Sequence, residues 1–249
     1  EINFGYLAGQ LIKNGYVDAK SCPGGGIGLN GYANACGLAA AKPAVVQIQN
    51  EFDDTILEAA RDTGVPPVAI KQLIRFESQF WPGQFGYHFG LGHVTFFGAH
   101  TALQWSPILA QIACKAAYGA QCGMQPVDEM MVGAFMGMMS ATCANCQYGI
   151  DKERAEQSII YLSHVMLAYC RQSAQVIGDA TQHEPEYIVD YPMMWKLTLF
   201  SYNAGSSCLS RAVSNAYGSL GDEITDWDTF TEFVDDEECK RGIDYVNNI

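Results

Sequence analysis

The spacing of apolar residues predicts helix along most of the chain. After Pro43, the segment VVQIQNEFDDTILEAARDTG repeats apolar residues three and four positions apart, as an amphipathic helix does. Phe52 and Ile56 fall on one face of this helix with Ala59 or its neighbour. The glycine that closes the segment ends the helix, so we expect one continuous element here.

A second helix is predicted immediately downstream. Pro66 and Pro67 open it, because proline is tolerated in a first turn, and VAIKQLIRFESQF continues it until Trp81-Pro82-Gly83. Helical spacing also predicts elements at 105–118, 126–141, 151–177, 192–203 and 207–217, and at least one more near the C-terminus. No repeated alternation of apolar and polar residues predicts strands, so the expected fold class is all-α, that is, mainly α.

Two segments lack a sustained helical period. Residues 21–42 are rich in glycine and small residues and contain two cysteines, which predicts an irregular, disulfide-stapled segment. Residues 83–100 combine several glycines with many aromatic residues and are expected to form a loop with short irregular turns. We therefore expect an N-terminal extension at 1–48 and one helical domain at 49–249.

Composition and charge limit the classes of partner. The 249 residues are 49% hydrophobic and 16% charged, with a formal net charge of −13. Nucleic acids and anionic membrane surfaces attract clustered Lys and Arg, so a neutral polymer is the better partner. No apolar run reaches the ~18 residues that a membrane span requires, and residues 1–20 lack the pattern of a secretory signal. We therefore expect a soluble or mature chain.

Nine cysteines are many for a reducing cytosol and indicate disulfides in an oxidising compartment. Sequence proximity favours the pairs Cys22 with Cys36 and Cys114 with Cys122. A third expected pair, Cys208 with Cys239, would tie the end of the chain to an earlier helix. The odd count leaves one thiol over, for which Cys170 is the candidate. Cys143-Ala-Asn-Cys146 has zinc-knuckle spacing, but a structural zinc site takes four ligands, so no metal is predicted.

One carboxylate stands out in the second helix. Glu77 shares a face with Ile70, Leu73 and Ile74, whereas the two cations of this helix lie on other faces. An acid in an apolar pocket has a raised pKa, which suits a general acid near neutral pH. The alternative is a glutamate at a helix end that reaches solvent past Trp81.

The distribution of acidic residues narrows the chemistry. From Ser78 through Val127 the chain contains no Asp or Glu. Most glycosidases use two carboxylates, but an N-acetylated sugar can stabilise its own cleavage with its acetamido group. Acids before Glu77 or after Val127 stay open as partners, and a true hydrolase would require one at about 6.5–9.5 Å from Glu77.

Four short blocks, in order, resemble the soluble lytic transglycosylases and goose-type lysozymes. They are Glu77-Ser78, Gly90-Leu91-Gly92-His93, Tyr202-Asn203-Ala204-Gly205 and the closing Tyr245-Val246. The similarity runs from about residue 50 to the end of the chain and leaves the N-terminal extension uncovered.

The resemblance implies a lysozyme-like fold and cleavage of the β-1,4 bond between N-acetylmuramic acid and N-acetylglucosamine in peptidoglycan. It makes Glu77 the acid and then the base in forming a 1,6-anhydro product, without a cofactor, at the cell envelope or outside the cell. By position it makes Tyr202 the residue that orients Glu77. The same similarity places Ser78 beside Glu77 and assigns the sugar groove to Gly90, Leu91, His93 and Asn203.

One departure from the family pattern leaves an alternative function open. The family usually has Gly-Leu-Met-Gln where this chain has Gly90-Leu91-Gly92-His93. Histidine donates and accepts hydrogen bonds as glutamine does, but its shape differs and it can become charged. The alternative is a catalytically degenerate module that binds glycan or serves a surface assembly.

Other clusters receive structural interpretations. His88, His93 and His100 do not have the spacing of a known zinc motif, so they are expected to bond locally. Among the aromatic residues of the 80–105 region, one or two are expected at a sugar groove. The methionines of 130–139 are expected to fill gaps in a buried helix, and the acidic run 235–238 to begin a helix or face solvent.

Overall fold

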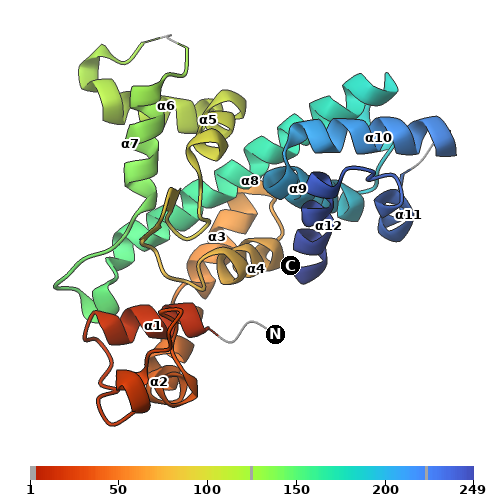
Figure 1. Ribbon diagram of the computed structural model, residues 1–249. Helices are drawn as coiled ribbons and strands as arrows, with labels where there is room; N and C mark the ends of the chain where they lie inside the picture. The colour runs from red at the N-terminus through yellow and green to blue at the C-terminus, as the bar shows by residue number, and fades with distance from the viewer. Residues whose placement is uncertain (1–3, 124–125, 222–223) are drawn as a thin grey trace. The chain divides into compact units, whose positions relative to one another are not determined.

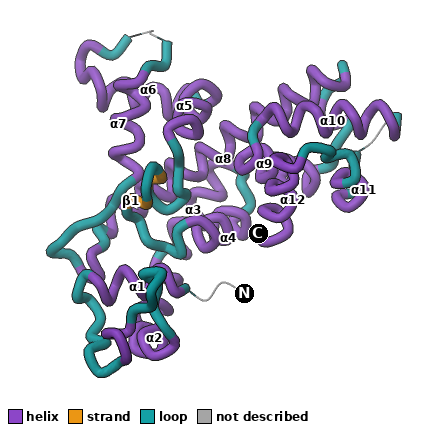
Figure 2. The backbone as a smooth tube through the Cα atoms, in the orientation of Figure 1, coloured by secondary structure: helices purple, strands orange, loops and turns teal. Residues whose placement is uncertain are grey.

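The computed structural model describes residues 4–123, 126–221 and 224–249 and is mostly helical, as Figure 2 shows. The expected all-α class is therefore confirmed. The chain divides into two compact units, one comprising residues up to His100 with Ile108–His164, and the other Thr101–Pro107 with Val165–Ile249. Within the described ranges, no helix combines the length and apolar character needed to cross a membrane.

The N-terminal part contains more helix than its composition predicts. It consists of α1 (Gly5–Lys13), the short 3-10 helix η1 (Pro23–Gly26) and α2 (Ala35–Glu51). Asn34 begins α2 by accepting a hydrogen bond from the Gly37 N–H at 2.9 Å. The expected irregular segment therefore ends at residue 34. The helix then continues through Pro43 and through the expected domain boundary after residue 48.

Close packing joins α1 to α2, which lie side by side in Figure 1. Gly37 lies so near Gly26 that an added Cβ would overlap the Gly26 carbonyl oxygen. The Cys22–Cys36 disulfide closes the same turn. Residues 1–3 of the expected extension lie outside the described residues.

The next two helices are α3 (Asp53–Thr63) and α4 (Pro67–Glu77). The single helix expected over residues 45–64 is wrong, because α2 ends and α3 begins at Phe52, which is buried. Gly64 ends α3 with φ +75°, a backbone conformation that glycine adopts without strain. The apolar face predicted for α4 is confirmed, because Ile70 and Leu73 are fully buried with Ile74.

The segment after α4 folds into a small hairpin and three more helical elements. These are β1 (Gln84–Phe85), β2 (His88–Phe89), α5 (Phe96–Trp105), α6 (Pro107–Tyr118) and η2 (Gly119–Gln121). The two strands pair antiparallel. The loop expected at 83–100 therefore ends where α5 begins, and Pro107 starts the helix that was expected from residue 105.

The rest of the first unit contains α7 (Glu129–Met139), η3 (Gln147–Gly149) and the first part of α8 (Lys152–Thr181). Asp128 begins α7 by accepting a hydrogen bond from Met131 N–H. Met131, Met136 and Met139 are buried, as expected, but Met130 is 59% exposed, so this methionine-rich helix buries one face rather than its whole surface.

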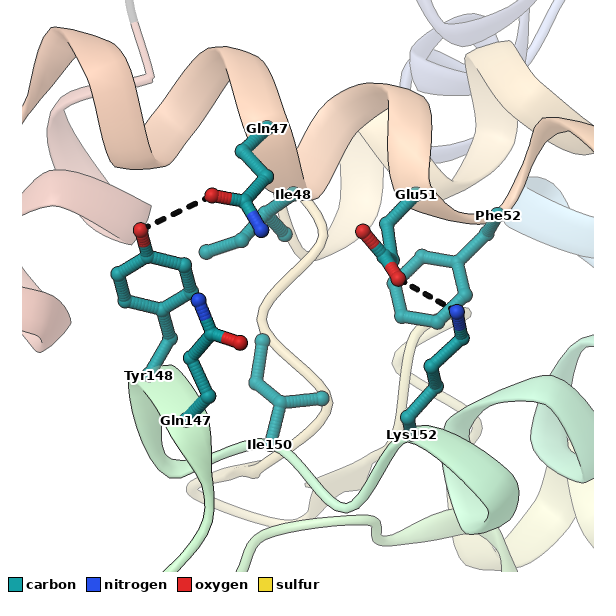
Figure 3. A pocket seen from close by; sticks show the side chains of 8 residues that line it. All are labelled: Gln47, Ile48, Glu51, Phe52, Gln147, Tyr148, Ile150 and Lys152. Atoms are coloured by element: carbon teal, nitrogen blue, oxygen red, sulfur yellow. Dashed lines mark hydrogen bonds and ion pairs between the residues drawn. The ribbon is translucent and has the colours of Figure 1, made fainter.

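Side chains from α2 meet the segment around η3, as Figure 3 shows. Tyr148 donates a hydrogen bond to Gln47 at 3.0 Å, and Lys152 pairs with Glu51 at 2.5 Å. A cavity of about 70 Å³ lies between these pairs. These contacts connect the N-terminal part to the start of α8.

The second unit contains the remainder of α8, η4 (Pro185–Tyr187), α9 (Tyr191–Ala204), α10 (Ser206–Leu220), α11 (Trp227–Thr231) and α12 (Glu237–Asn248). Helices α9 and α12 pack closely, because Gly242 of α12 has no side chain and the Phe200 ring of α9 lies directly against its backbone. An added Cβ there would lie 2.7 Å from that ring. Trp227 and Phe230 stack on each other and complete this aromatic core.

All nine cysteines lie within the described residues. The disulfides are Cys22–Cys36, Cys114–Cys122, Cys143–Cys146 and Cys208–Cys239. They include the three pairs favoured by the sequence, and Cys170 is the free thiol, as expected. The zinc-knuckle spacing at residue 143 instead belongs to a disulfide.

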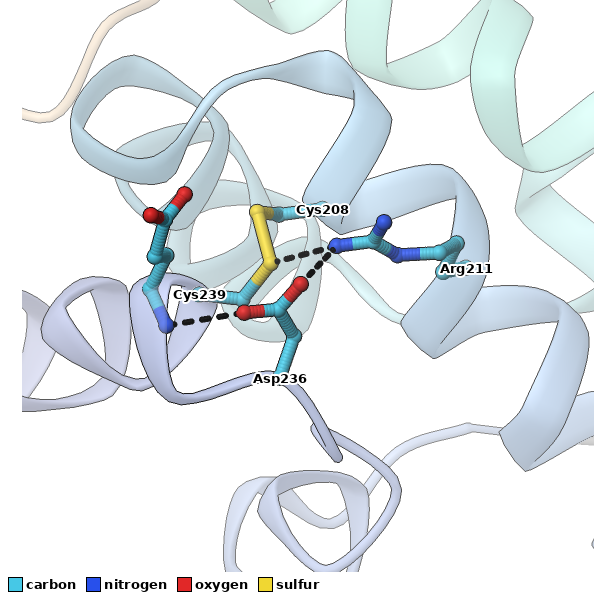
Figure 4. Close-up of a disulfide and its surroundings, with 5 residues drawn as sticks. Cys208, Arg211, Asp236 and Cys239 are labelled. Atoms are coloured by element: carbon cyan, nitrogen blue, oxygen red, sulfur yellow. Dashed lines mark hydrogen bonds and ion pairs between the residues drawn. A yellow bond between two sulfur atoms is a disulfide. The ribbon is translucent and has the colours of Figure 1, made fainter.

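Figure 4 shows the surroundings of the disulfide that ties α12 to α10. Asp236 begins α12 by accepting from the Glu238 N–H, and its other oxygen pairs with Arg211 at 2.7 Å. The acidic run therefore begins a helix, one of the two roles expected for it. An exposed pair of this kind adds little stability by itself, so the disulfide dominates this junction.

The two disulfides of most different loop length are expected to differ in stabilisation. Cys208–Cys239 spans 31 residues and Cys143–Cys146 spans 3. Loop-closure entropy predicts that replacing the first pair with alanines costs about 2 kcal/mol more in unfolding free energy than replacing the second. Urea unfolding of the two double variants measures this difference, and equal losses would contradict the entropic account.

Candidate active site around Glu77 and His93

Glu77 is the last residue of α4 and follows the helix's buried face. Its side chain is 17% exposed. The two cations of α4 are engaged elsewhere, because Lys71 pairs with Asp53 at 2.5 Å and Arg75 donates to Gln72 at 2.8 Å. The expectation that Glu77 lies on the apolar side, away from the helix's own cations, is therefore confirmed.

The Gly90–His93 block forms a tight turn. Phe89 and Val94 exchange two backbone hydrogen bonds of 3.0 Å, and the His93 N–H donates to the Gly90 carbonyl at 3.2 Å. His93 itself adopts φ +48°, which is uncommon for a residue other than glycine. The turn thus projects the His93 ring in one fixed direction.

The two glycines of this turn are required by its neighbours. Gly90 has φ +70°, and an added Cβ would overlap the backbone carbonyl oxygen of Met139. An added Cβ at Gly92 would overlap the side chain of Leu162, which is fully buried. The methionine usual in the resembled family therefore does not fit at position 92, because Leu162 occupies its space.

His93 faces Glu77 as a neutral imidazole. The distance from His93 Nδ1 to Glu77 Oε2 is 3.6 Å, slightly longer than a direct hydrogen bond. Burial, and then the neighbouring His88, lowers the pKa of His93 from 6.5 to about 4. The two side chains therefore do not form an ion pair near neutral pH.

The other nitrogen of His93 is an unsatisfied polar atom. Nε2 is buried and has no hydrogen-bond partner among the residues that the structure describes. A buried polar group without a partner costs stability unless water or a ligand supplies one. His93 thus offers a hydrogen-bonding atom beside the Glu77 carboxyl group.

The backbone after Glu77 is strained. Gln79 and Phe80 have φ of +52° and +71°, and Phe80 is buried. Left-handed residues other than glycine cost about 1–3 kcal/mol each and persist where the surroundings hold them. Here the conformation directs Gln79 Oε1 to accept hydrogen bonds from the N–H groups of Tyr6 and Leu7, at 2.9 and 3.3 Å.

The Gln79 side chain therefore caps the first turn of α1, whose N–H groups have no partner within the helix. This bond holds the Tyr6 ring against the loop. The Tyr6 ring meets the rings of Phe85 and His93 edge to face, at 5.6 and 6.4 Å between centroids. Burial raises the pKa of Tyr6 to about 12, so its hydroxyl stays protonated. Through the Tyr6 ring, the N-terminal segment lies against one side of the site.

Three residues expected to bind substrate, Ser78, Gly90 and Leu91, are buried instead. Ser78 and Leu91 are both 0% exposed, and the Ser78 hydroxyl donates to the Ile74 carbonyl at 3.2 Å. Neither presents surface that a glycan can touch. Ser78 and Leu91 anchor the helix end and the turn, so His93 and Glu77 carry the accessible chemistry of these two blocks.

Tyr202 and Asn203 lie on α9 in the second unit. The Tyr202 ring contacts Tyr169 at 5.0 Å and stacks on Tyr245 at 6.4 Å between centroids. These contacts bring the Tyr-Asn-Ala-Gly block against Tyr245 of the C-terminal Tyr-Val block. Asn203 Oδ1 is buried without a partner among the described residues, and the expected orientation of Glu77 by Tyr202 stays a prediction.

The three loop histidines do not assemble as a metal site. The rings of His88 and His93 lie 5.8 Å apart, and His88 Nδ1 is 3.2 Å from the His93 carbonyl oxygen, as local bonding predicts. In the portion of the chain that the structure describes, no group of His, Cys, Asp and Glu could hold a metal ion.

Comparison with known proteins adds no relative. No protein-family model matches the chain, and neither a curated protein nor a solved structure matches it. The functional argument therefore depends on the residues of the site and their geometry.

The packing of the turn predicts a sharp difference between two alanine variants. Gly90→Ala combines a left-handed backbone with overlap at Met139, whereas Gly86 has φ +58° and nothing within 4 Å of an added Cβ. We expect about 1 kcal/mol of lost stability for Gly86→Ala and about 3 kcal/mol or more for Gly90→Ala. Urea unfolding measures both, and similar losses would show that the turn can shift away from α7.

The low pKa of His93 makes stability depend on pH. Because the folded value is about 4 and the ordinary value 6.5, unfolding takes up a proton between these limits, so stability falls as the pH drops from 6.5 toward 4. His93→Gln should remove up to about 3 kcal/mol of that loss. Urea unfolding across this range tests it, with the exposed His183→Gln as control, and parallel curves for wild type and His93→Gln would contradict it.

Proposed function

We propose that this chain is a lytic transglycosylase that cleaves peptidoglycan between N-acetylmuramic acid and N-acetylglucosamine. The observation that carries the proposal is the placement of Glu77. It ends an apolar helix face, its side chain is mostly buried, and it faces a neutral histidine held by a rigid turn. This is an environment in which a carboxyl group can act as a general acid.

The proposed reaction uses Glu77 twice. Its carboxyl proton passes to the glycosidic oxygen as the bond from that oxygen to the muramyl C1 breaks. The substrate's acetamido group stabilises the positive charge at C1. The C6 hydroxyl oxygen then bonds to C1 and gives its proton back to Glu77, which leaves a 1,6-anhydro sugar and consumes no water.

His93 is proposed to assist by hydrogen bonding. A neutral imidazole has one donor and one acceptor nitrogen. Nδ1 lies nearer Glu77, and Nε2 is the buried atom without a described partner. His93 would orient the Glu77 carboxyl through the first nitrogen, and a buried water would be the partner of the second, which solvent does not reach.

The finer structural and cellular assignments belong to the same proposal. We propose a lysozyme-like arrangement of the helices, on the strength of the four ordered sequence blocks. We also place the protein at the cell envelope or outside the cell. The four disulfides support an oxidising compartment.

A second candidate function is glycan binding without cleavage. The same histidine favours it, because an imidazole ring lies beside Glu77 where the resembled family usually has a glutamine side chain of different shape. In this case the site would hold N-acetylated sugar, and Glu77 would accept hydrogen bonds from it rather than donate a proton.

Replacing the carboxyl group separates the two functions. Glu77→Gln keeps the shape of the side chain but removes the acid, so release of anhydromuropeptides should fall at least ~100-fold. Mass spectrometry of purified peptidoglycan after incubation measures this, with Glu58→Gln, an exposed glutamate of α3, as the control.

The control should release as much product as the wild type. Retained cleavage by Glu77→Gln would refute the role of Glu77. If the wild type releases no product, the binding function replaces the enzymatic one.

A further inference from the structure

The β1–β2 hairpin carries two aromatic side chains into solvent beside the candidate site. Phe85 is 51% exposed and Tyr87 is 86% exposed. Neither ring is buried in the core, although aromatic residues ordinarily stabilise a fold by burial. Exposed aromatic surface gathered at one place often marks a binding site.

The hairpin tip is held in a defined conformation. Phe85 pairs with His88, so Gly86 and Tyr87 form a two-residue turn, for which the φ of +58° at Gly86 is suited. The Gln84 side-chain amide donates to the Gly86 carbonyl at 2.7 Å. Tyr87 is therefore displayed by an ordered turn.

Phe85 is supported on one side by the candidate site. Its ring stacks on the His93 ring with centroids 5.9 Å apart and planes at 16°. The edge contact with Tyr6, at 5.6 Å, holds it from a second direction. An aromatic ring that is half exposed and held in this way is already ordered before a ligand binds. Binding therefore costs little side-chain entropy at Phe85.

The charge distribution identifies the class of ligand. From Ser78 to Cys114 the chain contains no Asp, Glu, Lys or Arg, so the hairpin offers no partner for a phosphate, a basic peptide or an acidic peptide. Aromatic rings with nearby amide groups suit a neutral ring that has an apolar C–H face and polar edges. A pyranose has both.

We propose that Phe85 and Tyr87 form a saccharide-binding subsite that stacks pyranose rings of an N-acetylated glycan next to Glu77. The inference deepens the proposed function and rests on it for the identity of the glycan. The route from the subsite to the acid is short, because His93 contacts both the Phe85 ring and the neighbourhood of Glu77.

Binding measurements test the subsite without requiring cleavage. Isothermal titration calorimetry with tetra-N-acetylchitotetraose is performed on Glu77→Gln and on the same protein carrying a second substitution. Tyr87→Ala should weaken binding roughly five- to tenfold, the size expected for loss of one aromatic stacking contact. Tyr187→Ala, which removes an exposed tyrosine of the second unit, should leave the affinity unchanged.

Two substitutions at Phe85 distinguish stacking from apolar bulk. Phe85→Leu should weaken binding as Tyr87→Ala does, whereas Phe85→Trp should retain it, because tryptophan keeps a ring. Thermal unfolding of each variant shows that the fold persists. A Phe85 variant could weaken binding indirectly by moving the His93 ring, which Phe85 contacts. Tyr87→Ala tests the subsite without this effect, because the stacking contact with His93 belongs to Phe85.

Unchanged affinity in both Tyr87→Ala and Phe85→Leu would overturn the subsite, as would an equal loss in Tyr187→Ala. Absence of measurable binding by Glu77→Gln would overturn it as well. Failure of the proposed enzymatic function appears elsewhere, as the absence of cleaved product from the wild type. In that event, a ring-dependent affinity would still establish the subsite.

Discussion

The packing of the Gly90–His93 turn against α7 and α8 is the constraint on which the candidate site depends. Gly90 leaves no room for a side chain beside Met139, and Gly92 leaves none beside Leu162. The two glycines therefore let the turn pack closely against both helices. In this packing the His93 ring lies opposite Glu77, and its stacking on Phe85 supports the exposed hairpin. A departure from the resembled family's motif is thus explained by the shape of the core beneath it.

The N-terminal segment belongs to this arrangement. Gln79, two residues after the proposed acid, caps α1 with its side chain and so places Tyr6 against Phe85 and His93. The strained backbone at Gln79 is what allows the cap. Tyr6 and Gln79 thereby connect the stability of the N-terminal segment to the geometry around Glu77.

Periodicity predicted the helices and the side of α4 on which Glu77 lies, because both depend on neighbours three and four residues apart. Sequence proximity likewise indicated Cys22–Cys36 and Cys114–Cys122. It did not indicate Cys143–Cys146, the shortest of the four, whose spacing was considered only as a zinc-knuckle pattern. The sequence patterns did not predict α1. They also did not predict the roles of Tyr6 and Gln79, which depend on contacts between residues more than 70 positions apart. The break at Phe52 was missed because both helices share one apolar period. Ser78 and Leu91 were assigned to the substrate by motif, whereas their complete burial depends on tertiary packing.

The central claim is that Glu77 acts as the single acid and base, with the substrate's own C6 hydroxyl as the nucleophile. Digestion of peptidoglycan in water enriched in oxygen-18, followed by mass spectrometry, tests this directly. The mechanism predicts anhydro-ended products without the heavy isotope, because no water enters the new bond. Reducing-end products that carry oxygen-18 at C1 would contradict it and require a second group that activates water.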